Sequence, residues 1–218
     1  MTMLSTATGL SVQMREGSRI EHEDAEGSSF MAALVDGRVN EAGYIDYLAS
    51  LRPIYAAMEA ISVRFAGDPV LDEVIDPALF RVPAIDSDLV FWAKGAPPLV
   101  QSAAVDAYVA RIEATVADPV LYLAHHYTRY LGDLSGGQVI GRILQRTYGL
   151  TDGEGTALYR FAEIPKPKPY KDGYRARLDA LPLSADEQDR VVDEVRLAFR
   201  LNQALFAELS AKLPQYLR

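Results

Sequence analysis

Histidine is the first residue type to consider for metal or acid–base chemistry, and this chain of 218 residues contains three. His22 precedes Glu26 by four residues, so in a helix the two side chains share one face. The carboxylate can then accept a hydrogen bond from one imidazole nitrogen and leave the other for a metal. The simpler interpretation is a surface histidine in an acidic stretch. Because the sequence has no cysteine and no histidine spacing typical of zinc sites, a metal at His22 would need further ligands from a cofactor.

The other two histidines are adjacent in the sequence. Neighbouring helical residues point about 100° apart, so His125 and His126 cannot serve one face of a helix together. We therefore expect both to be buried, hydrogen-bonded packing residues rather than ligands.

A second candidate site is the glycine-rich part of segment 121–150, which otherwise has a helical pattern. Each interior glycine costs about 1 kcal/mol relative to alanine, so several together indicate a compensating gain. On a helical wheel Gly132 and Gly136 lie about 40° apart and form one bare strip, with Arg129 on its border and Asp133 beside it. One interpretation is close packing of two helices. The other, favoured by the interleaved polar side chains, is a surface for a ligand. We expect Gly137 and Gly141 mainly to permit bending.

A flat ligand such as heme suits such a surface, with a histidine on its other face. Basic residues that could bind the carboxylates of heme occur in two parts of the sequence, one before His22 and one after segment 121–150. Arg15 and Arg19 precede His22, and a basic run follows segment 121–150. The alternative for this run is a solvent-exposed basic face. Its members are Lys166, Lys168, Lys171, Arg175 and Arg177.

Composition limits the remaining possibilities. The chain is 49% hydrophobic and 24% charged, which is typical of a globular protein. Its net charge of −8 argues against non-specific nucleic-acid binding. No run of eighteen apolar residues or signal peptide is evident, so we expect a cytoplasmic protein without a membrane anchor.

Helical periodicity dominates, and it predicts an all-α, single-domain protein. Residues 1–9 are expected to be a disordered segment, 10–214 the domain and 215–218 a short tail. Pro53 should bend its helix, and the prolines at 165, 167 and 169 predict an extended segment. The predicted helices are 11–26, 30–35, 40–65, 85–94, 99–117, 121–149, 170–181 and 184–213, with short helical turns over 70–82.

Several stretches resemble heme oxygenases. The string HHYTRYLGDLSGGQVIGRI closely resembles the distal-helix signature of that family, and LSVQMREGSRIEHEDAEGSSFM resembles its proximal segment. Counterparts of SLRPIYAAME, DLVFWAKG, YRARLDAL and AFRLNQALFAEL follow in order, so the resemblance covers about residues 10–213. It implies a helical bundle that holds heme between a proximal helix and a kinked distal helix, of the soluble bacterial type.

The resemblance also implies roles for single residues. His22 matches the proximal iron ligand and Glu26 its hydrogen-bonding partner. Asp133 matches the distal aspartate that organises water, and we expect no large shift of its pKa. Gly132 and Gly136 match the glycines against the distal heme face, and Arg129 and Tyr55 other members of the distal network. The remaining matches are Arg15, Tyr127, Lys171 and Arg175 around the propionates, Met31 near the heme edge, and Phe199 and Asn202 on the last helix.

The implied activity is oxidative cleavage of heme b, which is both cofactor and substrate, to biliverdin, CO and ferrous iron. The reaction uses O2 and electrons from an external donor, a ferredoxin, flavodoxin or reductase. Its expected purpose is iron release, and the expected state is a monomer. The competing interpretations are a heme carrier or sensor that does not cleave the ring, and a helical protein that binds no heme.

Overall fold

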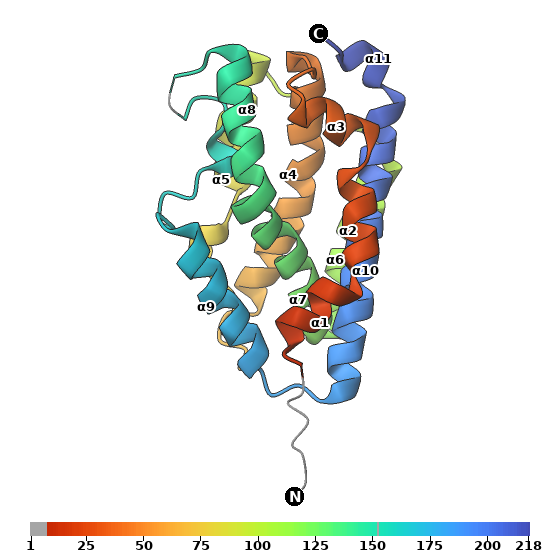
Figure 1. The fold of residues 1–218 in the computed structure, drawn as a ribbon, viewed down its shortest axis with the longest axis vertical. Coiled ribbons are helices and arrows are strands. Elements are labelled where there is room, and N and C mark those ends of the chain that lie inside the picture. The colour runs from red at the N-terminus through yellow and green to blue at the C-terminus, as the bar shows by residue number, and fades with distance from the viewer. Residues whose placement is uncertain (1–7, 152) are drawn as a thin grey trace, which may run out of the picture.

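The computed structural model describes residues 8–151 and 153–218, so residues 1–7 of the segment expected to be disordered lie outside it. The described residues form helices and no strand beyond one isolated bridge between Val39 and Leu217 (Figure 1). The all-α prediction is therefore confirmed. The helices are α1 (Leu10–Gly17), α2 (Arg19–Glu26), α3 (Ser29–Val35), α4 (Glu41–Arg64), α5 (Val82–Ala93), α6 (Ala103–Ala114), α7 (Tyr122–His126), α8 (Gln138–Tyr148), α9 (Pro167–Ala180), α10 (Ala185–Ala211) and α11 (Leu213–Tyr216).

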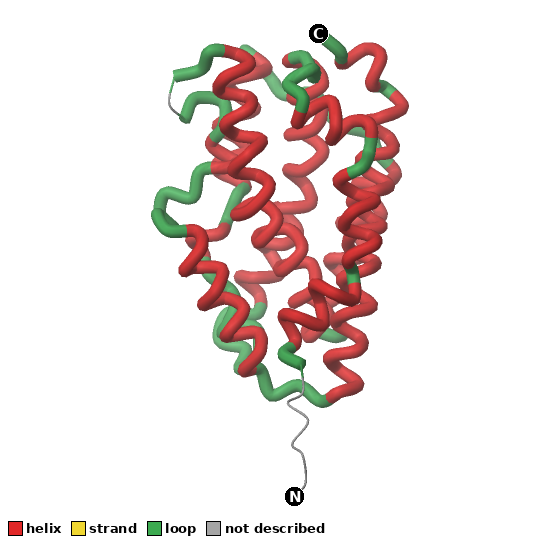
Figure 2. Tube along the Cα trace, viewed as in Figure 1, coloured by secondary structure: helices red, strands yellow, loops and turns green. Residues whose placement is uncertain are grey.

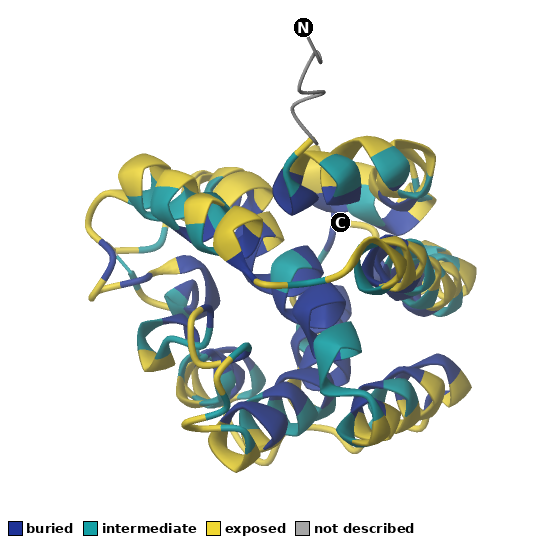
Figure 3. Ribbon diagram, turned by 90° about the horizontal axis from the view of Figure 1, so that it is seen from below, coloured by how far each residue is buried: buried dark blue, intermediate teal, exposed yellow. Residues whose placement is uncertain are grey.

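Two long helices, α4 and α10, form the frame of the bundle, and their ends follow local sequence signals. The Asn40 side chain accepts a hydrogen bond from the Gly43 amide at the start of α4. Ser184 and Glu187 form a reciprocal capping box at the start of α10. Seen along the bundle, buried residues face the interior and exposed residues cover the outside (Figure 3).

The glycine-rich segment is a continuous but irregular helix. Between α7 and α8 the chain winds through two π-helical stretches, Tyr127–Leu131 and Asp133–Gly137 (Figure 2). Such wide turns are rare and occur frequently at functional sites, because they re-aim the side chains that follow. Gly149, with φ of 60°, ends the helix in the left-handed conformation that favours glycine.

Three boundary predictions are wrong. The expected helix 11–26 is divided at Ser18, whose hydroxyl donates to the Met14 carbonyl at 2.8 Å. The segment expected to be extended instead begins α9 at Pro167. Proline is tolerated in the first turn because the amides there have no partner within the helix. Likewise, α6 begins only after Ser102, whose side chain caps it, rather than at residue 99.

Candidate functional site

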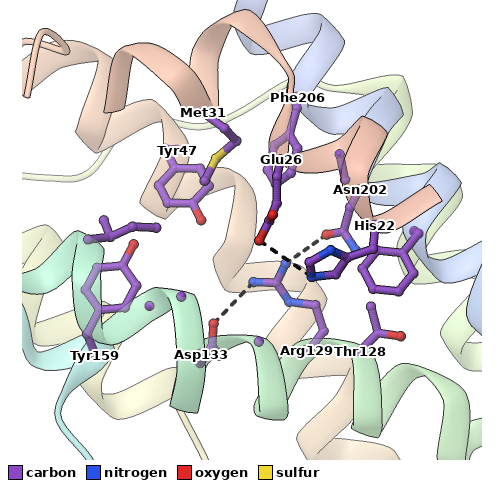
Figure 4. A pocket seen from close by; sticks show the side chains of 16 residues that line it. His22, Glu26, Met31, Tyr47, Thr128, Arg129, Asp133, Tyr159, Asn202 and Phe206 are labelled. Atoms are coloured by element: carbon purple, nitrogen blue, oxygen red, sulfur yellow. Dashed lines mark hydrogen bonds and ion pairs between the residues drawn. The ribbon is translucent and has the colours of Figure 1, made fainter. Parts of the chain in front are cut away.

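A cleft separates α2 from the π-helical part of the opposite helix. His22 and Glu26 line it from α2, and Gly132 and Gly136 line it from the opposite wall. Its inner part measures about 660 Å³ and its outer part about 960 Å³, both including space that opens to solvent. Figure 4 shows the inner part.

His22 lies on the wall formed by α2, called the proximal wall below, and its side chain is 49% exposed. The opposite wall, which carries Gly132 and Gly136, is called the distal wall. His22 Nε2 lies 3.5 Å from Glu26 Oε1, so the carboxylate faces one ring nitrogen and leaves the second for a ligand. The ring of Phe199, from α10, contacts the imidazole edge-on at a centroid distance of 5.2 Å. The described residues contain no cluster of three or more histidine, aspartate or glutamate side chains that could hold a metal ion.

The four glycines of the opposite wall separate into two pairs. A Cβ added to Gly132 or Gly136 would meet no atom within 4 Å, so this pair faces the open cleft and does not pack against a helix. A Cβ at Gly137 would lie 2.8 Å from Tyr159 Cδ1, and one at Gly141 would lie 3.2 Å from Tyr159 Cβ. The second pair therefore makes room for an aromatic ring, where we had expected it mainly to permit bending.

A buried polar network lies behind the glycine strip. The Arg129 guanidinium donates from Nη2 to the Tyr55 hydroxyl at 2.8 Å and from Nη1 to Asn202 Oδ1 at 2.8 Å. Tyr55 in turn donates to Asp133 Oδ2. Arg129 Nη2 lies 3.9 Å from Asp133 Oδ1, which is within ion-pair distance but too long for a direct hydrogen bond. Asn202 is held from its other side by Ala198 O at 3.0 Å.

Burial sets the protonation of this network. It raises the pKa of Asp133, and Arg129, Tyr55 and Arg81 offset that rise only in part. The sequence does not reveal the direction of this shift, because it does not show that Asp133 is only 7% exposed. Burial also raises the pKa of Tyr55 well above its usual value, so its hydroxyl is a proton donor at neutral pH.

The outer part of the cleft carries the basic side chains. Arg15, Arg19, Tyr127 and Arg175 line it, each arginine also paired with a neighbouring acid. Lys171 does not line the cleft directly, but its Nζ donates to Ser135 Oγ, a lining residue, at 2.7 Å. Of the basic run, Lys168 is exposed and pairs with Asp172 at 3.4 Å.

His125 and His126 are fully buried away from the cleft, as expected of packing residues. His125 Nε2 lies 2.8 Å from Glu194 Oε1, and His126 Nδ1 lies 2.8 Å from the Tyr174 hydroxyl. The two rings of His126 and Tyr174 stack with an interplanar angle of 4°.

Sequence reasoning missed several residues that line the inner cleft, among them three aromatic residues and a threonine. Tyr47 enters from α4, Thr128 from the π-helical wall, Tyr159 from the loop before α9, and Phe206 from α10 (Figure 4). The spacing of Gly137 and Gly141 was a signal that a bulky side chain packs there. It did not say which one, since Tyr159 comes from a separate loop.

The sequence profile described as heme oxygenase matches residues 8–208. The chain is also 38% identical over 210 residues to heme oxygenase 1 of the cyanobacterium Synechocystis, covering 95% of this chain and 87% of that one. The chain belongs to the heme oxygenase family. An animal relative is similar to the same degree: heme oxygenase 1 of Rattus norvegicus is 38% identical, over 97% of this chain and 75% of its own length.

Solved heme oxygenase structures share the fold. The Synechocystis heme oxygenase-1 crystal structure, a complex with heme, superposes with a TM-score of 0.90 at 37% identity and covers 95% of each chain. The Leptospira interrogans heme oxygenase gives a TM-score of 0.88 at 34% identity, covering 92% of this chain and all of that one. In the described part of the present chain, every helix is too short or too polar to cross a bilayer.

Proposed function

We propose that the cleft binds heme b as both cofactor and substrate, with His22 as the axial ligand of its iron. The protein then cleaves the ring with O2 and external electrons, giving biliverdin, CO and ferrous iron. The observation that carries this assignment is the open space above Gly132 and Gly136 opposite His22. A planar ligand needs a flat wall without Cβ atoms on one face and a ligating side chain on the other.

The remaining cleft residues fit heme as well. Apolar side chains suit the porphyrin, with Met31 in the inner part and Phe199 beside His22. Its propionates would meet Arg15, Tyr127, Lys171 and Arg175 at the outer mouth. The Thr128 hydroxyl is buried, lines both parts of the cleft and has no hydrogen-bond partner among the described residues, so it is available to a ligand or water.

Bound heme supplies the redox chemistry that activates O2, and its ring is the carbon framework that is oxidised. The chain's own contribution is to position protons on the distal side. Asp133 lines the inner cleft, where its carboxyl would hold water that can pass a proton to the distal face. Tyr55 donates to Asp133 Oδ2 and keeps the carboxyl oriented. Arg129, fixed by Asn202, holds Tyr55 in turn.

Electrons must come from a partner protein. The outer mouth carries Arg15, Arg19 and Arg175 although the whole chain has a net charge of −8. An acidic ferredoxin, flavodoxin or reductase domain would complement this rim and approach the propionate edge of the ligand. We propose that the protein works as a cytoplasmic monomer and that its purpose is iron release.

One experiment tests the proposal. Hemin is added to the purified protein, followed by a reductant under air, and the visible spectrum is recorded. We expect a Soret band that is lost as biliverdin absorption appears. A Soret band that persists would instead show a carrier or sensor, and the absence of any band would show that no heme binds. His22→Ala should lose the axial ligand and change the ferric spectrum, while an unchanged spectrum would place the ligand elsewhere.

A further inference from the structure

Tyr159 packs its ring against the distal wall, and hydrogen bonds fix the backbone around it. Gly137 and Gly141 leave the space it occupies, and Gln138 Nε2 donates to the Tyr159 carbonyl at 2.6 Å. On the other side, both carboxylate oxygens of Asp88 accept backbone amides just before Tyr159, each at 2.8 Å. A loop residue fixed in this way is preorganised, as residues of functional sites are.

Tyr47 reaches the same end of the cleft from the opposite side. It projects from α4 and lines the inner part together with Tyr159. Figure 4 shows the two phenol side chains entering from opposite walls with their hydroxyls turned toward each other, beyond Asp133 as seen from His22. Both residues are 4% exposed, so bulk solvent does not hydrate them freely.

The hydroxyl of Tyr159 is an unmatched polar group. It is buried and has no hydrogen bond of good geometry among the described residues, although it lies close enough to the Tyr44 and Tyr47 hydroxyls to affect their pKa values. The hydroxyl of the neighbouring Tyr44 is in the same condition. A buried hydroxyl without a partner costs about 1–3 kcal/mol, and native proteins commonly avoid this cost with an ordered water. The inner cleft, which both Tyr47 and Tyr159 line, has open volume and polar groups for such a water.

We propose that Tyr47 and Tyr159 form a second hydrogen-bonding site that holds a water molecule at the inner end of the cleft. Tyr47, Tyr159 and Asp133 all line the inner cleft, so this water can exchange protons with water held at Asp133. The pKa of Tyr47 responds to the same network: burial raises it, the Arg129 charge lowers it, the Asp133 charge raises it, and hydrogen-bonding interactions with Tyr159 and Arg129 lower it. Tyr47 and Tyr159 are thus positioning residues that act through water and Asp133, a role that rests on the proposed function.

The water site is tested first without heme. High-resolution crystal structures are determined for the heme-free protein and for Tyr47→Phe and Tyr159→Phe, and their thermal midpoints are measured. We expect an ordered water within hydrogen-bonding distance of both hydroxyls, its loss in either variant, and a lower midpoint for Tyr159→Phe. If the pocket is dry, no water is seen and Tyr159→Phe raises the midpoint, because it removes an unsatisfied polar group. That pair of results overturns the proposal.

The second test concerns protons and uses the heme complex. Tyr47→Phe should slow biliverdin formation several-fold and increase its solvent deuterium isotope effect, with heme affinity unchanged. In an Asp133→Asn background the same change should cause no further loss, because the water acts through Asp133. Equal losses in both backgrounds would refute the link. The control is Tyr148→Phe, which removes a hydroxyl bonded to Val39 O at 2.7 Å outside the cleft and should leave both quantities unchanged.

The two tests separate the claims. If the native chain forms no biliverdin from heme, the proposed function fails, yet the heme-free structures still decide whether the water site exists. If biliverdin forms normally but the heme-free pocket is dry, only the water site is refuted.

Discussion

Replacing neighbouring glycines of the distal wall by alanine should have opposite effects on stability. Gly136→Ala places a methyl group in open space, since nothing lies within 4 Å of it, and removes the conformational cost of glycine in a helix. That change alone should stabilise the heme-free protein by up to about 1 kcal/mol. For a chain of this size we expect a rise in the thermal midpoint of roughly 2–4 °C.

Gly137→Ala should do the reverse. Its Cβ would lie 2.8 Å from Tyr159 Cδ1, and this ring cannot withdraw because Gln138 and Asp88 fix its loop. Forced overpacking of this kind typically costs about 1–3 kcal/mol, which exceeds the helix-propensity gain. We therefore expect Gly137→Ala to lower the thermal midpoint.

The two variants should rank in the opposite order for heme affinity: Gly136→Ala should bind heme less well than Gly137→Ala. In Gly136→Ala the new methyl group occupies the wall against which the ligand lies, so heme affinity and biliverdin yield should fall although the protein is more stable. The assays are thermal unfolding followed by circular dichroism and hemin titration followed in the Soret region. The reasoning is refuted if Gly136→Ala destabilises the heme-free protein, or if it binds and cleaves heme like the native chain.

Three further predictions concern the distal carboxyl, acid stability and the donor surface. Asp133→Ala should retain heme but lose biliverdin yield by about 10²-fold, with peroxidase-like oxidation of an added dye in its place; a normal yield would remove Asp133 from the mechanism. Burial lowers the pKa of His126 from 6.5 to about 3, so its neutral form stabilises the fold above pH 6.5, and this contribution is lost as pH falls. We therefore expect the free energy of unfolding of the heme-free native chain to fall between pH 7 and 4.5 by about 2–3 kcal/mol more than that of His126→Gln, as measured by urea unfolding. Parallel pH profiles of the two proteins would contradict this. Turnover with an acidic protein donor should decline with rising ionic strength and with Arg175→Glu, and salt-independent turnover would exclude the basic rim as the docking surface.

The sequence predicted most reliably what depends on local chemistry. The predicted starts of the helices 40–65 and 184–213 are confirmed, because the short polar side chains of Asn40 and Ser184 bind amides only a few residues away. The pairing of His22 with Glu26 followed from helical spacing alone. Pro167 was misjudged because proline in isolation is compatible with both an extended strand and a first helical turn.

What escaped prediction depends on segments that meet only in the folded chain. The wheel placed Gly132 and Gly136 on one bare strip, but it could not show that Tyr159 packs against Gly137 and Gly141. The raised pKa of Asp133 also arises from tertiary burial rather than from neighbours in sequence. Tyr47 belongs to the same class, since its importance is visible only when α4 faces the distal wall.

The two walls of the cleft differ greatly in how many of their residues are buried. Of the residues in α2 only Ala25 is buried, whereas all five residues of α7 are. Local opening should therefore require much less free energy in α2, and we expect its amides to exchange with solvent far faster than those of α7. A ligand bonded to His22 and resting on Gly132 and Gly136 joins the loose wall to the firm one, so it should slow this exchange. Cleavage of the ring would remove the ligand that joins the two walls. The proximal wall should then open more easily, at the stage when the product must leave.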